Sequence, residues 1–208
     1  MKLKICGMRE PKNINAIATL APNYMGFVFW EPSSRFVNQS TPALTEKIKK
    51  TGVFVDASID YIEQSINEHK LQAVQLHGKE TSLHCKEIQN LGVEVIKAFS
   101  IRDEFNFSEL EVYENCCDFF LFDTKGELPG GNGYRFDWSI LETYPSKKPF
   151  FLRGGIGIEN VEELQKLIKT NLPLYAIDVN SKFESAPAIK KIKELKQFKN
   201  ELYEVSCR

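Results

Sequence analysis

The sequence carries almost no net charge. Among its 208 residues, 27 Lys and Arg stand against 28 Asp and Glu, which leaves a formal net charge of -1. A chain balanced in this way offers no electrostatic reason to expect nucleic acid or an anionic membrane as a partner. Lysines do gather between Lys190 and Lys199, but they alternate with apolar residues at helical spacing. That spacing is typical of the solvated face of a helix.

Long apolar runs and a disulfide framework are also missing. No apolar run approaches the ~20 residues needed to cross a bilayer, and Met1 leads directly into a strand pattern, so we expect neither a membrane span nor a signal peptide. The five cysteines are odd in number and lack scaffold-like spacing, which favours a reducing, cytoplasmic location. Without a CxxC motif or a histidine partner, no metal site is expected. We interpret four cysteines as small apolar fillers: Cys85, Cys116, Cys117 and Cys207.

What the chain does have is a regular alternation of short apolar runs with longer amphipathic segments. The runs are rich in Val, Ile and Phe, as expected of strands in a parallel sheet covered by helices. They lie near residues 2–6, 25–29, 52–55, 72–76, 93–99, 118–122, 149–153 and 174–179. Helical spacing follows in several of the intervals, most clearly at residues 59–66, 161–168 and 187–203.

Eight such units predict a (β/α)8 barrel, an α/β fold with eight parallel strands. At 208 residues the chain is shorter than the ~250 typical of that fold, but a strand, a helix and a loop still fit each unit. The pattern alone leaves a doubly wound open sheet as a competitor. No Pro/Gly/Ser-rich linker divides the chain, so we expect a single catalytic domain over residues 1–208.

Two connections are too long and too rich in turn residues to be simple joins. They cover residues 30–37, after the second strand, and residues 124–134, after the sixth, where Gly130 and Gly131 lie. In a barrel these loops sit at the C-terminal face, where active sites are built.

Two side chains at strand ends could move protons. Cys6 closes the first strand, and Gly7 leaves space beside its sulfur. A thiolate serves as a base when nearby positive charge or a helix N-terminus favours it. Asp123 ends the apolar run Phe119–Phe122, and the surrounding apolar surface is expected to raise its pKa and to favour a role as an acid. In one barrel these two groups would face each other across its mouth.

Anion binding is suggested at the last two strand ends. Gly154 and Gly155 close the seventh strand, and their backbone N–H groups can approach an anion closely. Asn180 and Ser181 follow the eighth, where a short helix would point its positive end inward. Elsewhere, Arg35 could hold a carboxylate in bidentate fashion. For His77 the sequence leaves three roles open: ligand, hydrogen-bond partner or packed residue.

In combination these residues resemble the phosphoribosylanthranilate isomerase family of tryptophan biosynthesis. The matching segments run in order over about residues 2–185, and their combination is far more specific than any one of them. They are residues 4–8, 26–29, 34–37, 75–78, 122–123, 130–133, 136–138, 154–156, 159–161, 177–181 and Glu184.

The resemblance implies an Amadori rearrangement in a (β/α)8 barrel. Asp123 would protonate the furanose oxygen of a phosphoribosyl substrate, and Cys6 as thiolate would remove the proton from C2. Arg35 would hold the anthranilate carboxylate, and backbone amides near Gly155 would hold the phosphate with Gly154, Asn180 and Ser181. No cofactor is implied, because the substrate's own nitrogen is the electron sink. Further substrate contacts are expected from Gln75, His77, Gly130, Gly131 and Asp178.

Two positions depart from the family pattern. Arg153 stands where family members usually carry Ala before the glycine pair, and residues 180–184 lack the usual glycine of the strand-8 loop. The charge of Lys182 could offset the missing glycine. Arg153 could act in the same way, or it could pair with Asp178.

Other functions remain open at this stage. An isomerase with two aspartates, a decarboxylating indole synthase or a metal-dependent epimerase would share the barrel but would need other residues at the strand ends. A barrel that binds an anionic metabolite without turnover is the alternative from a different class. The phosphorylated small-molecule substrate is the expected partner, and the assembly is expected to be a monomer or a homodimer.

Overall fold

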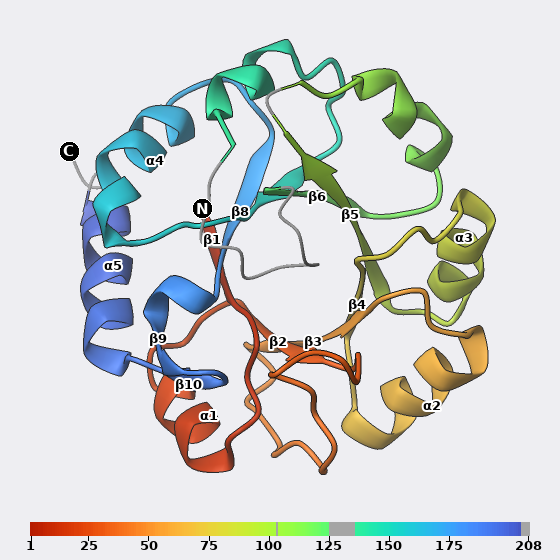
Figure 1. Cartoon of the computed structure of the whole chain (residues 1–208), viewed down its shortest axis with the longest axis vertical. Helices are drawn as coiled ribbons and strands as arrows, with labels where there is room; N and C mark the ends of the chain where they lie inside the picture. Colours follow the sequence, from red (N-terminus) through yellow and green to blue (C-terminus); the bar gives the residue numbers. More distant parts are fainter. Residues whose placement is uncertain (103, 125–135, 205–208) are drawn as a thin grey trace.

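The computed structural model describes residues 1–102, 104–124 and 136–204. Eight parallel strands form a closed barrel in chain order, because β1 pairs with β8 as well as with β2 (Figure 1). Closure confirms the predicted (β/α)8 barrel and shows that the open doubly wound sheet is wrong. Each predicted run overlaps one strand: β1 Lys2–Ile5, β2 Tyr24–Val28, β3 Lys49–Phe54, β4 Ala73–Leu76, β5 Glu94–Ile101, β6 Phe119–Thr124, β7 Phe150–Leu152 and β8 Leu174–Val179.

Side chains of the strands alternate between the barrel interior and the layer of helices. Below the C-terminal mouth, on the side of the N-terminal strand ends, the barrel interior is filled by a cluster to which six strands contribute: Tyr24, Ala73, Ile96, Leu121, Phe151 and Ala176. The larger core lies between strands and helices and includes Phe27 and Phe54, both without exposed surface. Because inward and outward positions alternate, a polar residue two positions beyond an interior apolar residue also points inward.

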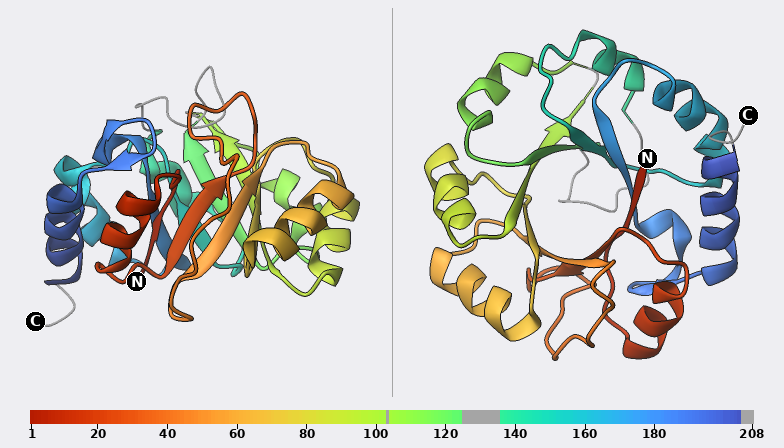
Figure 2. Two further views of the ribbon diagram at one scale, coloured as in Figure 1. Left: turned by 90° about the horizontal axis from the view of Figure 1, so that it is seen from below. Right: turned by 180° about the vertical axis from the view of Figure 1, so that it is seen from behind.

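Five α-helices surround the barrel in the described residues (Figures 1 and 2). They are α1 Pro11–Ala18, α2 Ile59–His69, α3 Ser82–Asn90, α4 Val161–Ile168 and α5 Ile192–Glu204. The Ser58 and Thr81 side chains cap α2 and α3 by accepting hydrogen bonds from backbone N–H groups. No described helix is long and apolar enough to span a membrane.

The missing helices explain how the barrel fits in a short chain. Residues 29–48, after β2, form an irregular connection with no α-helix. In the described part after β5 and β6 only the 3-10 helices η1 Phe107–Tyr113 and η2 Trp138–Thr143 replace one. A 3-10 helix supplies a covering turn with fewer residues than a full α-helix.

The predicted helix over residues 187–203 starts too early. Residues Glu184–Ala186 (β9) and Ile189–Lys190 (β10) instead form a small antiparallel hairpin, and α5 begins at Ile192. Pro187 and Ala188, which has a left-handed φ of 67°, make the turn between them. Figure 2 shows this hairpin at the C-terminal face of the barrel, beside the ends of β1 and β8. The short helix expected after the eighth strand is one 3-10 turn, Ser181–Phe183 (η4).

Candidate active site

The ionisable residues predicted at the strand ends meet inside the C-terminal mouth of the barrel. Cys6 follows β1, His77 follows β4, Asp123 lies in β6, and Asp178 lies in β8. Cys6, Asp123 and Asp178 are buried: Cys6 has no exposed surface, and Asp123 is only 3% exposed. The side chain of His77 is 6% exposed. Gly130 and Gly131, which were also predicted as substrate contacts, lie outside the described residues.

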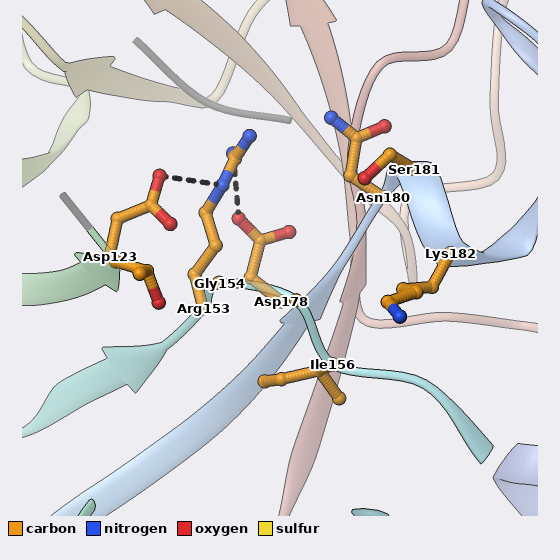
Figure 3. A pocket seen from close by; sticks show the side chains of 10 residues that line it. Asp123, Arg153, Gly154, Ile156, Asp178, Asn180, Ser181 and Lys182 are labelled. Carbon is orange, nitrogen blue, oxygen red and sulfur yellow. Dashed lines mark hydrogen bonds and ion pairs between the residues drawn. The ribbon is translucent and has the colours of Figure 1, made fainter. Parts of the chain in front are cut away.

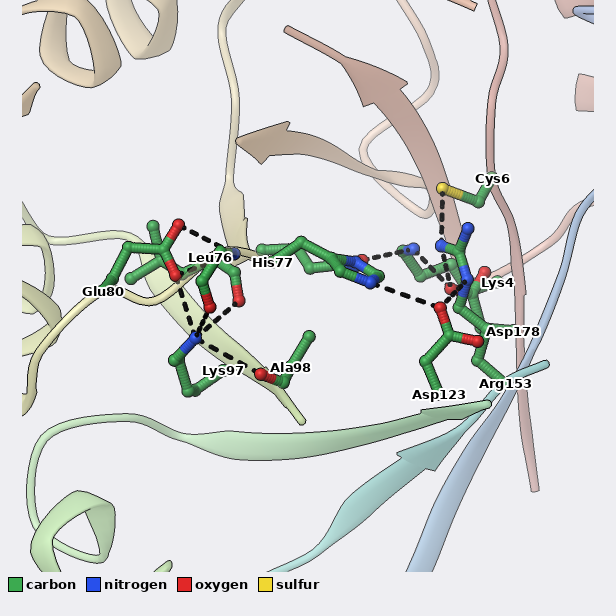
Figure 4. A network of polar contacts seen from close by, with 12 residues as sticks. Lys4, Cys6, Leu76, His77, Glu80, Lys97, Ala98, Asp123, Arg153 and Asp178 are labelled. Atoms are coloured by element: carbon green, nitrogen blue, oxygen red, sulfur yellow. Dashed lines mark hydrogen bonds and ion pairs between the residues drawn. The ribbon is translucent and has the colours of Figure 1, made fainter. Parts of the chain in front are cut away.

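A chain of polar contacts crosses the interior (Figure 4). Lys4 Nζ donates to Gln75 Oε1 and to Asp178 Oδ2, both at 2.8 Å. Gln75 Nε2 lies 2.6 Å from His77 Nδ1, and His77 Nε2 lies 3.2 Å from Asp123 Oδ2. These contacts join four strands of the barrel, so a change at one member is transmitted to its neighbours.

This chain of polar contacts also determines which nitrogen of His77 carries the proton. Because Gln75 Oε1 accepts from Lys4, the amide nitrogen is the atom that faces His77. An amide N–H can only donate, so Nδ1 of His77 accepts and its proton resides on Nε2. His77 therefore donates toward the Asp123 carboxylate. His77 is thus a hydrogen-bond partner of Gln75, and its predicted contact with the substrate stays a prediction.

Arg153 occupies the centre of the site (Figures 3 and 4). Its Nε lies 3.1 Å from Asp123 Oδ2, and its Nη1 lies 3.2 Å from Asp178 Oδ2 and 3.5 Å from Cys6 Sγ. Of the two alternatives left open for Arg153, the pairing with Asp178 is present in the structure. One guanidinium also joins the thiol to the carboxyl group that the sequence placed opposite it.

The expected effect of burial on Asp123 is overturned by its neighbours. Burial alone would raise the pKa of this carboxyl, but the charge of Arg153 and the hydrogen bond from His77 outweigh it and lower the pKa. The apolar run before Asp123 suggested a raised pKa, because the residues next to Asp123 in the sequence do not include Arg153, the cation that follows β7. In the unliganded protein Asp123 is therefore an ionised carboxylate at neutral pH.

Two glycines allow close packing around Cys6. A Cβ at Gly26 would lie 2.6 Å from Sγ, too close for any real side chain. Gly7 has a φ of 74°, and a Cβ there would lie 2.6 Å from Asn180 Oδ1 and 2.7 Å from Arg35 Cδ. Gly26 thus leaves room for the Cys6 side chain, and Gly7 lets Asn180 and Arg35 approach the backbone next to Cys6.

A small pocket that is open to solvent lies beside Arg153 (Figure 3). All four residues predicted to bind phosphate line it: Gly154, Gly155, Asn180 and Ser181. Asp123, Asp178, Arg153 and Lys182 complete its polar wall. Gly154 and Gly155 both have positive φ values, 103° and 60°, and a Cβ at Gly154 would collide with Thr124 Oγ1. Glycine is thus required where the chain turns along the pocket wall.

Arg35 lies apart from this pocket's lining. It makes a bidentate ion pair with Glu184, with Nε 3.0 Å from Oε1 and Nη2 2.6 Å from Oε2. Lys190 Nζ bridges the same Glu184, at 2.5 Å, to Asn180 Oδ1, at 2.6 Å. The β9–β10 hairpin therefore connects Arg35 to the pocket through Lys190 and Asn180.

Sequence reasoning missed Lys4 and Lys190 as members of the site. Lys4 lies two residues before Cys6, so both point into the barrel, and a lysine inside an apolar strand was the available signal. Lys190 belonged to the segment interpreted as a solvated helix face. Instead it is 3% exposed, because the hairpin turns it inward. Its role depends on a turn that helical spacing concealed.

Together, the closed barrel, the enclosed thiol and carboxylate, and the glycine-lined pocket define a (β/α)8-barrel protein with an ionisable site at the usual catalytic face. The family model described as N-(5'phosphoribosyl)anthranilate (PRA) isomerase matches residues 3–201. The chain belongs to this family.

Individual relatives agree with that assignment. The N-(5'-phosphoribosyl)anthranilate isomerase of Parabacteroides distasonis is 44% identical and covers 95% of this chain and 91% of its own. That of Phocaeicola vulgatus is 41% identical, with coverages of 97% and 98%. Among solved structures, phosphoribosyl anthranilate isomerase from Thermus thermophilus superposes with a TM-score of 0.86 at 27% identity and full coverage of both chains.

A further solved structure is a ligand complex. It contains phosphoribosyl anthranilate isomerase with reduced 1-(o-carboxyphenylamino)-1-deoxyribulose 5-phosphate. The TM-score is 0.80 at 26% identity, over 97% of this chain and 98% of that one. The similarity to a 3-hexulose-6-phosphate synthase from Salmonella typhimurium, at 12% identity and a TM-score of 0.65, shows the fold alone.

Proposed function

We propose that this protein converts N-(5'-phosphoribosyl)anthranilate to 1-(2-carboxyphenylamino)-1-deoxyribulose 5-phosphate, an aldose–ketose isomerisation of tryptophan biosynthesis. Membership of the isomerase family supports the substrate, as does the product-like ligand in the solved neighbour. The observation that carries the proposal for this chain is the arrangement of Cys6 and Asp123 in one enclosed network, linked by a single guanidinium.

The first step assigned to this site opens the sugar ring. Asp123, once protonated, gives its proton to the ring oxygen, and the bond between that oxygen and C1 breaks. The lone pair of the anthranilate nitrogen forms the double bond to C1, which yields a protonated Schiff base. His77 donates to Asp123 and holds its carboxyl group in place.

The second step moves a proton from carbon. The Cys6 thiolate removes the hydrogen from C2, and the released pair forms the C1–C2 double bond while the nitrogen regains its lone pair. The resulting enolamine becomes the ketone when the C2 hydroxyl loses its proton and C1 gains one. The substrate's nitrogen supplies the electron sink, so the chemistry calls for no cofactor.

Binding is assigned to the pocket and its rim. Backbone amides at Gly154 and Gly155, with Asn180 and Ser181, would hold the phosphate, since the two glycines have no side chain to block an anion. Arg35 would hold the anthranilate carboxylate in place of Glu184, because the guanidinium already binds a carboxylate in bidentate geometry.

Further substrate contacts are proposed at the remaining predicted positions. Gln75, His77 and Asp178 lie in the contact chain beside Cys6 and Asp123, and all three would also face the bound sugar. Gly130 and Gly131 would contribute from the loop after β6. We further propose one catalytic domain over residues 1–208, a cytoplasmic location, and a monomer or a homodimer as the assembly.

The activity can be tested with purified protein and the fluorescent substrate. We expect anthranilate fluorescence to fall with time, and we expect the gene to restore growth of a tryptophan auxotroph that lacks the isomerase. Unchanged fluorescence, together with tight binding of a reduced product analogue, would favour a barrel that binds the metabolite without turnover. The observation that favours this second function is Arg153, which contacts Cys6 within the site.

A further inference from the structure

The proposed chemistry requires the sugar to lie between Cys6 and Asp123. In the structure that space is taken by a side chain of the protein itself. The Arg153 guanidinium contacts Asp123 Oδ2 through Nε, at 3.1 Å, and Cys6 Sγ through Nη1, at 3.5 Å. Figure 4 shows it between the two groups. The sugar cannot place its ring oxygen at the carboxyl group and its C2 hydrogen at the thiol while the guanidinium fills the space between them.

We propose that Arg153 belongs to the substrate site, and that it exchanges its contacts with Asp123 and Cys6 for the substrate's phosphate when the sugar enters. This inference rests on the proposed isomerase function. It assigns to Arg153 a positioning role for the acid and a binding role toward the phosphate, whereas Cys6 and Asp123 remain the groups that transfer protons.

Arg153 lies next to the proposed phosphate site, so its guanidinium has only a short distance to move. Arg153 lines the pocket together with Gly154, Gly155 and Ser181, and the glycine pair follows it directly in the chain. An anion held by those backbone amides would therefore lie beside the arginine. A guanidinium binds a phosphate through parallel N–H donors, which a lone carboxylate oxygen cannot match. In the structure each guanidinium contact is with a single oxygen or the sulfur, at 3.1 to 3.5 Å.

If Arg153 moves away, Asp178 still has a cation as partner, whereas Asp123 loses the cation that it contacts. Asp178 Oδ2 is also bound by Lys4 at 2.8 Å, so this carboxylate stays paired with a cation. Among the described residues, Asp123 is faced by Arg153, which follows β7, by His77, which follows β4, and by the backbone of its neighbour Thr124.

Departure of the guanidinium would prepare Asp123 for its role. Arg153 is the largest influence that lowers the pKa of Asp123, and burial opposes it. Without the guanidinium, burial would dominate and the pKa would rise, which favours the protonated acid that ring opening needs. The same movement would thus clear space for the sugar and supply the proton donor. It also resolves the conflict between an ionised carboxylate in the unliganded protein and an acid in the reaction.

Inorganic phosphate provides a probe that needs no turnover. Its affinity is measured by calorimetry, and the titration of Asp123 is followed by carbon NMR of aspartate-labelled protein, with Asp123→Asn to assign the signal. In the wild type we expect phosphate to raise the pKa of Asp123. In Arg153→Met we expect phosphate to bind about 10-fold more weakly or worse, because a charged hydrogen-bond donor is lost. The pKa of Asp123 in that variant should be higher before any phosphate is added.

Two further variants make the test specific. Arg9→Met removes an arginine that pairs with Glu10 away from the pocket, and it should bind phosphate like the wild type. Arg153→Lys keeps a positive charge and should bind phosphate more tightly than Arg153→Met, which keeps the experiment decisive if the methionine variant fails to fold. Equal phosphate affinity in the wild type and the folded Arg153 variants would overturn the proposal, as would an Asp123 pKa that does not respond to phosphate.

The wild-type turnover assay separates this inference from the function on which it rests. If the wild type consumes the substrate while phosphate leaves Asp123 unchanged, the role of Arg153 fails alone. If the wild type shows no turnover, the proposed function fails, whatever the arginine does.

Discussion

Two buried ionic networks lie at the same end of the barrel, and both are drawn in Figure 4. One joins Lys97 and Glu80, whose side chains are 3% and 1% exposed. The other is the chain from Lys4 to Asp123 and Arg153. Both place full charges out of contact with water, yet only the second is built around the pocket.

The Lys97–Glu80 network is closed. Lys97 Nζ lies 2.9 Å from Glu80 Oε2 and 2.8 Å from the Gly78 carbonyl oxygen. Glu80 Oε1 accepts from the backbone N–H groups of Asp56 and Gly78, both at 3.0 Å. Burial would raise the pKa of Glu80, but Lys97 and these N–H groups lower it. Each charge is compensated, and the network ties the loop after β4 to β5.

The interior network is open by comparison. Asp178 Oδ1 has no hydrogen-bond partner among the described residues, although it is buried. Arg153 divides its donors among three partners at longer distances. Buried charged groups with unused hydrogen-bonding atoms lower the stability of the fold unless a further partner binds those atoms. From this comparison we expect the satisfied network to stabilise the fold and the unsatisfied one to serve the proposed binding of the substrate.

Replacing the proton-transfer groups should have the largest effect. In Asp123→Asn and Cys6→Ser we expect kcat to fall by about 10²–10⁴, the usual contribution of general acid–base catalysis. Affinity for a reduced product analogue should stay within a few-fold, because binding is assigned mainly to other groups. Steady-state kinetics and calorimetry measure the two quantities. A variant that retained wild-type kcat would remove its residue from the mechanism.

Breaking the closed network should instead reduce stability. Lys97→Met leaves Glu80 buried without its cation, which typically costs roughly 3–5 kcal/mol in the free energy of unfolding. Urea denaturation measures this loss, and kcat of the folded fraction should remain within a few-fold of the wild type. If kcat collapsed while stability held, the division between a structural and a functional network would be wrong.

A smaller effect is expected at the pocket wall. Gly154→Ala places a Cβ against Thr124 at a φ of 103°, and such backbone strain costs about 1–3 kcal/mol. Because Gly154 lines the phosphate pocket, KM should rise more than kcat falls. Gly92→Ala is a matched control: its φ of 79° is strained too, but its Cβ would meet nothing within 4 Å. A wild-type KM in Gly154→Ala would argue against phosphate binding at this turn.

The smallest change concerns pH. The pKa of Glu80 is lowered in the folded protein from its usual 4.5, so its ionised form favours folding. That contribution is fully present above about pH 4.5 and is lost as the pH falls through the lower, folded pKa. The difference in unfolding free energy between wild type and Glu80→Gln should therefore shrink at acidic pH. A difference that stayed constant with pH would contradict the assigned pairing.

Most of the fold could be predicted because strand signals are local. The Val, Ile and Phe runs mark all eight strands, and parallel strands buried on both faces leave that signal clearly. The last helix was misplaced at its start because Pro187 and Ala188 form a turn within residues that also match helical spacing. The position of the candidate site residues followed from the same local logic, since the C-terminal ends of the strands must meet at one face.

What the sequence determined by itself is therefore which residues occur at that face: a thiol, a carboxyl group, a histidine and a glycine pair, each placed by alternation along its strand. What only the tertiary structure decided is the ionisation of Asp123, whose pKa the Arg153 guanidinium lowers. Arg153 is distant in the chain from Cys6 and Asp123. The pairing of β6 with β7 brings its guanidinium to Asp123, and closure of the barrel between β8 and β1 brings it within 3.5 Å of Cys6. Electrostatic energy depends on distance in space and on burial, so the ionisation of Asp123 follows from the folded barrel rather than from its neighbours in sequence.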